Sequence, residues 1–152
     1  MEQLHIEIID EQVFAAVDHD QLQRAGRVAL DFLGIEQAEL SVVLLDNPSI
    51  HEWNRNTLQH DFPTDVITFP LSEPGELLEG ELLISVEMAA SMAAEMGWSM
   101  QNECTLYLVH GILHLVGYDD LNPADQLQMR ARERELLEHL DITPGPNDDR
   151  WS

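Results

Sequence analysis

The chain has 152 residues, 44% of them hydrophobic, which is enough for the core of one domain. Its 29 acidic residues outnumber seven basic ones, and the formal net charge of −22 argues against general attraction to nucleic acid, so DNA is not an expected partner. No apolar run reaches the roughly 18 to 20 residues of a membrane span, and the first residues lack a signal-peptide pattern. We therefore expect a cytoplasmic protein without a membrane partner.

Strand and helix signals alternate in the first third of the chain. We expect, in chain order, a strand over 4–9, a helix from a cap at Asp18 or Asp20 to Gly34, a strand over 39–45, and a short helix opened by the turn at 46–48. A loop then runs to residue 65 and carries the sequence DFPTD. This order predicts strands and helices that pack against each other in one domain.

Two further strands and three helices are predicted in the remainder. A strand over 66–69 and a strand over 81–86 are expected to pair as a hairpin. A first helix carries methionines every fourth residue and breaks near Gly97, and a second begins at Ser99 or Gln101. The third is expected over 124–140, with these leucines turned inward: Leu127, Leu136, Leu137 and Leu140.

The predicted fold class is α+β. We expect a small mixed β-sheet of about four strands with about five helices, and a metal site at the end of a central helix. The domain is predicted to cover residues 1–142. Residues 143–152 are rich in proline and aspartate, which predicts a disordered tail.

A histidine pair gives the chain its most specific signal. His110 and His114 lie four apart in an apolar segment, and about 100° of rotation per residue puts both on one face of a helix. Gly117 is placed to end that helix in a left-handed conformation, so that the chain turns back and brings Asp119 or Asp120 beside the imidazoles. This predicts a divalent metal with three protein ligands and an open position for water.

The residue after His110 is Gly111, whereas zinc proteases of the HExxH type have a glutamate base there. Peptide hydrolysis by that route is therefore disfavoured. No protein group is identified as the catalytic residue, and we expect metal-bound water to do the chemistry. The lone Cys104 is expected to fill the core.

Three stretches of the sequence resemble the YbeY family of bacterial endoribonucleases and rRNA maturation factors. They are the histidine motif at 110–120, the DxPTDV motif at 61–66 and a Gly80-Glu81 strand. The resemblance places the third ligand at position 120, so that His110, His114 and Asp120 would bind one metal ion. Only the resemblance favours zinc, because two histidines and a carboxylate also suit iron.

Three positions depart from the family pattern. The family has a third histidine where this chain has Asp120, an arginine where it has Leu58, and an arginine where it has Asn102. Carboxylate oxygens bind zinc at distances similar to those of imidazole nitrogens, so the first change keeps the site. The other two remove expected RNA contacts and leave Arg55 as the candidate for substrate binding near the second motif.

The other arginines considered for a polyanionic substrate are Arg24, Arg27, Arg130, Arg132 and Arg134. Signs alternate along 130–135, which is more typical of a solvated, salt-bridged helix face than of an RNA site.

The resemblance implies a metal-dependent endoribonuclease that acts on single-stranded rRNA, in maturation of the small-subunit 3′ end and in ribosome quality control. The implied partners are rRNA and the small ribosomal subunit or its proteins. One alternative is a metal-dependent hydrolase of another substrate class. Another is a non-catalytic ribosome-assembly factor in which the metal is structural, and the acidic composition suits that alternative.

Overall fold

The structure is a computed structural model that describes residues 3–50, 52, 66–73, 77–119 and 121–151. Its strands are β1 (Gln3–Asp10), β2 (Gln37–Leu45), β3 (Val66–Pro70) and β4 (Leu78–Ser85). Its labelled helices are α1 (His19–Phe32), α3 (Val86–Met96), α4 (Met100–Leu115) and α5 (Pro123–His139). None of the described helices is long and apolar enough to cross a membrane.

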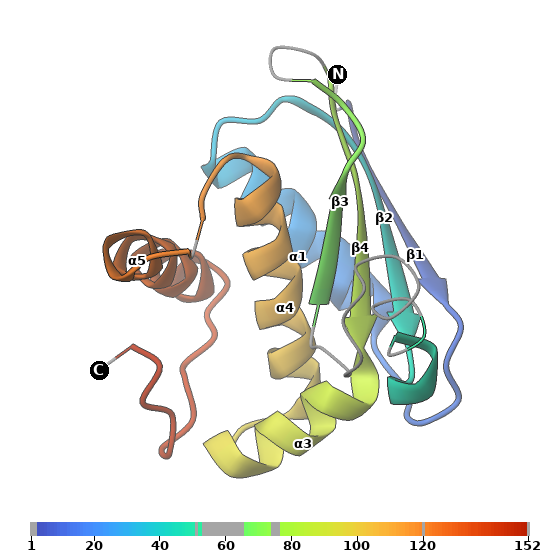
Figure 1. The fold of residues 1–152 in the computed structure, drawn as a ribbon, viewed down its shortest axis with the longest axis vertical. Helices are drawn as coiled ribbons and strands as arrows, with labels where there is room; N and C mark the ends of the chain where they lie inside the picture. The colour runs from blue at the N-terminus through green and yellow to red at the C-terminus, as the bar shows by residue number, and fades with distance from the viewer. Residues whose placement is uncertain (1–2, 51, 53–65, 74–76, 120, 152) are drawn as a thin grey trace.

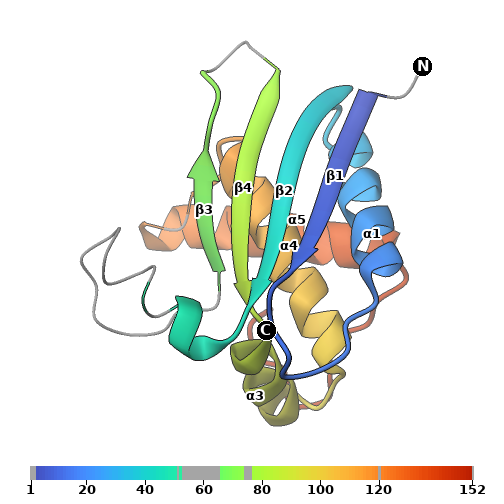
Figure 2. The same cartoon turned by 90° about the vertical axis from the view of Figure 1, so that its right-hand side faces the viewer.

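The four strands form one mixed sheet in the order β1-β2-β4-β3. The pairs β1–β2 and β2–β4 are parallel, while β3 runs antiparallel to β4, with Val66 opposite Ile84 and Pro70 opposite Gly80. The predicted hairpin and the mixed α+β fold are therefore confirmed. Helices α1 and α4 cover one face of the sheet, and α5 lies beyond α4 on the side away from it (Figures 1 and 2).

Helix boundaries follow the capping signals. Asp18 caps α1 by accepting from the backbone N–H of Gln21 at 3.1 Å, so Asp18 rather than Asp20 is the cap. Ser99 caps α4 in the same way, and Asn122 caps α5 one residue before Pro123. The sequence-based boundaries of these helices are correct to within about two residues, the usual precision for such ends.

Helix α4 approaches the sheet closely because glycine stands at the contact. A Cβ added at Gly111 would lie 2.6 Å from Cδ2 of Leu82, and one added at Gly80 would lie 2.6 Å from Cδ1 of Leu115. Both contacts join α4 to β4 in the main core. Gly111 therefore has a packing role that a glutamate at this position could not fill without moving the helix from the sheet.

The inward face of α5 differs from the prediction. Leu136 and Leu137 are fully buried as expected, but Leu127 is 74% exposed. The buried positions of α5 also include Met129 and Glu133, which share the face of Leu136 and Leu137. Leu127 precedes Met129 by two residues, about 200° round the helix, and so faces away from the core.

The segment after α5, for which disorder was predicted over 143–152, makes specific contacts through its described residues. The backbone N–H of Asn147 donates to the carbonyl of Met96 at 3.3 Å, and the Arg150 guanidinium contacts the fully buried carboxylate of Glu103. Composition predicted disorder because it counts few apolar residues, but two carboxylates and one arginine hold this segment by ionic contacts.

Candidate metal centre

The two histidines of the motif lie on one face of α4, near its C-terminal end. Their Nε2 atoms are 3.1 Å apart and their rings meet at 80°. Two nitrogen ligands at about 2.0–2.1 Å from a tetrahedral zinc ion would be about 3.3–3.4 Å apart. The pair therefore has nearly the spacing that a shared metal ion requires.

The helix ends at this pair as predicted. Gly117 has φ 108°, its N–H donates to the carbonyl of His114 at 3.1 Å, and the N–H of Tyr118 donates to the carbonyl of Leu113 at 2.9 Å. These two bonds form a Schellman motif, which ends helices on a residue of positive φ. The chain reverses here, and residues 118–119 follow the turn.

A buried carboxylate of α5 orients the first histidine. Oε2 of Glu133 lies 2.5 Å from Nδ1 of His110, and the Glu133 side chain is fully buried while that of His110 is 19% exposed. Nη1 of Arg130 donates to Oε1 of the same carboxylate at 2.7 Å. A carboxylate that accepts the Nδ1 proton leaves the Nε2 lone pair of His110 available for a metal.

This partner was not assigned from the sequence. Glu133 accepts the ring N–H of His110, although it lies 23 residues away in the sequence. Its spacing from His110 carries no local signal, because the contact depends on how α5 crosses α4.

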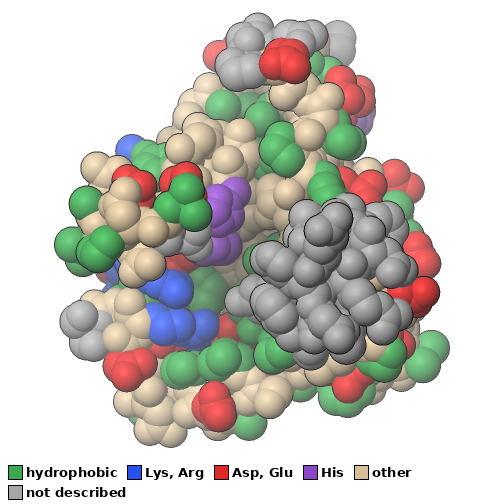
Figure 3. Space-filling view, in the orientation of Figure 1, with side chains coloured by type: hydrophobic (Ala, Val, Ile, Leu, Met, Phe, Trp, Pro, Cys, Tyr) green, Lys and Arg blue, Asp and Glu red, His purple; other side chains and the backbone are tan. Residues whose placement is uncertain are grey.

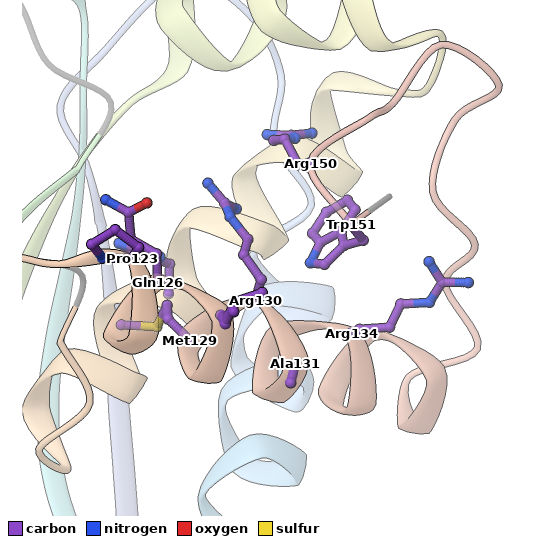
Figure 4. A pocket seen from close by; sticks show the side chains of 10 residues that line it. Pro123, Gln126, Met129, Arg130, Ala131, Arg134, Arg150 and Trp151 are labelled. Atoms are coloured by element: carbon purple, nitrogen blue, oxygen red, sulfur yellow. The ribbon is translucent and has the colours of Figure 1, made fainter.

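The site opens into a pocket of about 750 Å³. Apart from His110, its lining comes from α5 and from the segment after it. Histidine and arginine side chains gather in the same recess, between α5 and the body of the molecule (Figure 3). Arg130, Arg134, Arg150 and Trp151 line the wall of the pocket (Figure 4).

The only cysteine is outside this chemistry. Cys104 is fully buried in α4, and burial together with the charge of Glu103 raises the pKa of its thiol to about 12. The thiolate is the reactive form of cysteine, so this group is not a nucleophile near neutral pH. The expectation that it fills the core is confirmed.

Comparison with known proteins identifies the family. A family model described as "Endoribonuclease YbeY" matches residues 6–141. A relative named "Endoribonuclease YbeY" from Exiguobacterium sp. (strain AT1b) is 40% identical over 125 residues, which cover 74% of this chain and 79% of the relative. One of the same name from Salinibacter ruber is 36% identical and covers 87% of this chain and 94% of the relative. The chain belongs to the YbeY family.

The fold agrees with this assignment. The solution structure of TM1509 from Thermotoga maritima aligns with a TM-score of 0.65 and 26% sequence identity, and covers 89% of this chain and 88% of that one. The resemblance to the YbeY family, which the histidine motif indicated, is therefore confirmed.

Several predicted YbeY site residues lie outside the described residues. They are the third ligand Asp120, the substrate candidate Arg55, and the DxPTD motif of 61–65. Among the residues that the structure describes, no cluster of three or more possible ligands occurs. The structure thus brings two of the three predicted ligands together, and the assignment of Asp120 stays a prediction.

The three arginines predicted for the last helix differ in their contacts. Arg132 donates to the hydroxyl of Tyr118 at 2.7 Å and to Glu135 at 3.3 Å, and Arg134 pairs with Glu138 at 3.4 Å between exposed side chains. Solvated, salt-bridged contacts of this kind were expected. Arg130 is the exception, because its partner Glu133 is fully buried beside His110.

Sequence reasoning missed Arg150, because it fell in the segment predicted to be disordered. Burial of Arg150 opposes its charge, but its hydrogen bonds to Glu103 and Asp148 outweigh this and raise its pKa above the usual range. Burial of Asp148 likewise opposes ionisation, but hydrogen bonds from Arg150 keep the pKa of Asp148 below its ordinary value. A lone arginine beside a tryptophan in an acidic chain was the signal that could have directed attention here.

Proposed function

We propose that this chain is a metal-dependent endoribonuclease that cuts single-stranded RNA in the cytoplasm. We further propose that it acts in rRNA processing, including maturation of the small-subunit 3′ end and ribosome quality control. Its partners are then rRNA and the small ribosomal subunit or its proteins. Membership of a family whose relatives are named endoribonucleases supports this proposal.

The observation that carries the proposal is the 3.1 Å separation of the His110 and His114 Nε2 atoms. We propose that His110, His114 and Asp120 hold one divalent ion, with zinc favoured by the family. When bound, such an ion supplies a Lewis acid for a phosphoryl oxygen and makes a water molecule acidic enough to attack near neutral pH.

The residues of the chain have separate parts in this mechanism. Glu133 accepts the Nδ1 proton of His110 and so fixes its tautomer, while Arg130 holds Glu133 in place. Gly117 turns the chain so that the residues after it can approach the imidazoles. The pocket beside His110 gives an RNA strand access to this end of α4.

A cleavage assay tests the proposal. The purified protein is incubated with single-stranded and structured RNA, with and without a chelator, beside the variants His110→Ala and His5→Ala. His5 is exposed on β1, so it is a matched control for the loss of a histidine. We expect cutting of the single strand that the chelator and His110→Ala abolish and that His5→Ala retains.

The other outcomes select the alternatives. Intact RNA together with metal-dependent sedimentation on small ribosomal subunits would select an assembly factor with a structural metal. The contact of His110 with Glu133 joins α4 to α5 and makes this the second candidate. Chelator-sensitive hydrolysis of another substrate class, with intact RNA, would select a different hydrolase.

The third ligand has its own test in metal content. Asp120→Ala is expected to lose tightly bound metal and Asp120→His to retain it, because imidazole and carboxylate bind zinc at similar distances. Unchanged metal in the alanine variant, measured by elemental analysis, would reject Asp120 as a ligand.

A further inference from the structure

Arginines concentrate in the pocket beside the histidine pair. The chain has seven arginines and no lysine, and among the described residues Arg130, Arg134 and Arg150 line this pocket together with His110. The net charge is −22, so basic side chains are scarce over the molecule as a whole. Their position beside His110, which a buried carboxylate orients, suits this wall of the pocket to binding a negatively charged ligand.

Arg150 anchors the segment that carries the tryptophan. Its Nη1 and Nη2 atoms donate to the two oxygens of Glu103 at 2.8 and 2.9 Å, and Nη2 also donates to Asp148 at 2.7 Å. The side chains of Glu103 and Asp148 are fully buried and that of Arg150 is 15% exposed. Two carboxylates therefore balance the charge of Arg150, which serves as an anchor and not as a free phosphate contact.

Trp151 is held in the pocket wall by this anchor. The Arg150 guanidinium carbon is 5.1 Å from the centroid of the Trp151 ring, and the Trp98 ring meets Trp151 edge-on at 6.3 Å. The buried indole Nε1 of Trp151 has no hydrogen-bond acceptor among the described residues. An aromatic ring held in the wall of a pocket is suited to a ligand that stacks.

Two arginines beside the ring carry exposed charge. The Arg130 guanidinium carbon lies 5.9 Å from the Trp151 centroid, and 38% of that side chain is exposed although its Nη1 donates to the buried Glu133 at 2.7 Å. Among the described residues, Arg134 pairs with the exposed Glu138 at 3.4 Å, a pairing that contributes little in water. In Figure 4 the side chains of Arg130 and Arg150 reach the same space as the Trp151 ring, above α5.

We propose that Trp151, flanked by Arg130 and Arg134, is a subsite that stacks one base of single-stranded RNA next to the His110–His114 centre. This proposal rests on the proposed function and names where that substrate binds. Proteins that hold single strands combine aromatic rings under the bases with basic groups along the backbone. Stacking does not depend on net charge, so it offsets the repulsion between an acidic protein and a polyanion.

The test separates binding from cleavage. Binding is measured with a 2′-O-methyl oligonucleotide, which resists ribonucleases that use the 2′-hydroxyl, in the presence of chelator so that no metal-dependent cutting occurs. Cleavage of the matching RNA is measured separately. Trp151→Ala should raise Kd and KM about tenfold, the size of one lost stacking contact. Trp151→Phe, which keeps a ring, should lose less, and kcat should not change in either variant.

Oligonucleotides with a single abasic position identify the stacked base. At one position near the cleaved bond, removal of the base should weaken binding to the wild-type protein and leave Trp151→Ala unaffected, because both changes remove the same contact. Arg134→Gln should reduce the slope of log affinity against log salt by about 0.7, the value for one phosphate contact on a single strand. The matched control Arg24→Gln, exposed on α1, should leave that slope unchanged.

Each outcome decides one of the two proposals. RNA cutting by the wild type with equal Kd for wild type and Trp151→Ala would overturn the subsite and leave the endoribonuclease intact. Binding that depends on Trp151 without any cutting would support the subsite and reject the catalytic function. If Trp151→Ala lowers Tm, the Trp151→Phe variant decides. A Kd of Trp151→Phe as high as that of Trp151→Ala would reject stacking.

Discussion

The two sides of helix α4 are packed by different physical means. The side that faces the sheet is apolar, with Gly111 set close to Leu82 and Leu115 set close to Gly80. On the outer side, where α4 meets α5 and the segment after it, buried carboxylates form hydrogen bonds with histidine, arginine and indole groups. One helix thus has a side with apolar packing and a side where buried ionic contacts add to the apolar packing of Met129 and Leu136.

The difference explains why the histidine pair lies where it does. Apolar packing tolerates many arrangements of similar volume, whereas a buried carboxylate is stable only when its charged or hydrogen-bonding partners are correctly placed. Glu133 meets this requirement with His110 and Arg130, and Glu103 meets it with Trp98 and Arg150. The polar side therefore fixes the orientation of the side chains, which a metal site needs, while the apolar side supplies most of the stability.

The largest effect is expected on the apolar side. Leu82→Ala removes a fully buried side chain that touches Gly111, and should lower the free energy of unfolding by about 2–5 kcal/mol. Adding Gly111→Ala should recover part of this loss, because the new methyl group enters the space that Leu82 leaves. Urea denaturation of both single variants and the double variant measures the coupling. Strictly additive losses would contradict the contact between α4 and β4.

A smaller effect, confined to the site, is expected on the polar side. Glu133→Gln keeps the shape of the residue but removes the charge that orients His110, and should weaken metal binding about 10–100-fold. Competition with a chromophoric chelator measures this affinity. The control is Glu135→Gln on the same helix, whose side chain is 49% exposed and pairs only with Arg132 among the described residues. Equal metal affinity in the two variants would show that Glu133 does not support the site.

The smallest effect is expected from acid. The pKa of Asp148 in the folded protein lies below its ordinary value of 3.8, because hydrogen bonds from Arg150 outweigh the cost of burial. Its contribution to stability is therefore present above pH 3.8 and is lost as the pH falls through the lower folded-state value.

This loss is followed by tryptophan emission of the metal-free protein, recorded between pH 6 and pH 2.5. Asp148→Asn should remove the low-pH step that belongs to Asp148. A wild-type profile identical to that of the variant would mean that this ion pair does not hold the segment after α5.

Local rules predicted most of the fold. The caps at Asp18 and Ser99, the β3–β4 pairing and the turn at Gly117 each depend on residues close in sequence. The outward position of Leu127 was not predicted, since a leucine pattern alone does not say which stripe of α5 meets α4. The ligand Asp120 and the substrate contact Arg55 remain predictions, because both lie outside the described residues.

By itself, the sequence determined that His110 and His114 share a face of a helix that ends at Gly117, because four-residue spacing and a glycine of positive φ are local properties of the backbone. Only the tertiary structure decided that Glu133 orients His110 and that Arg150 holds Trp151 in the same pocket. The Glu133 contact spans 23 residues and the Arg150 contact with Glu103 spans 47. Such pairings form only when α5 and the segment after it pack against α4, and that packing depends on whole helix surfaces, which no short motif encodes.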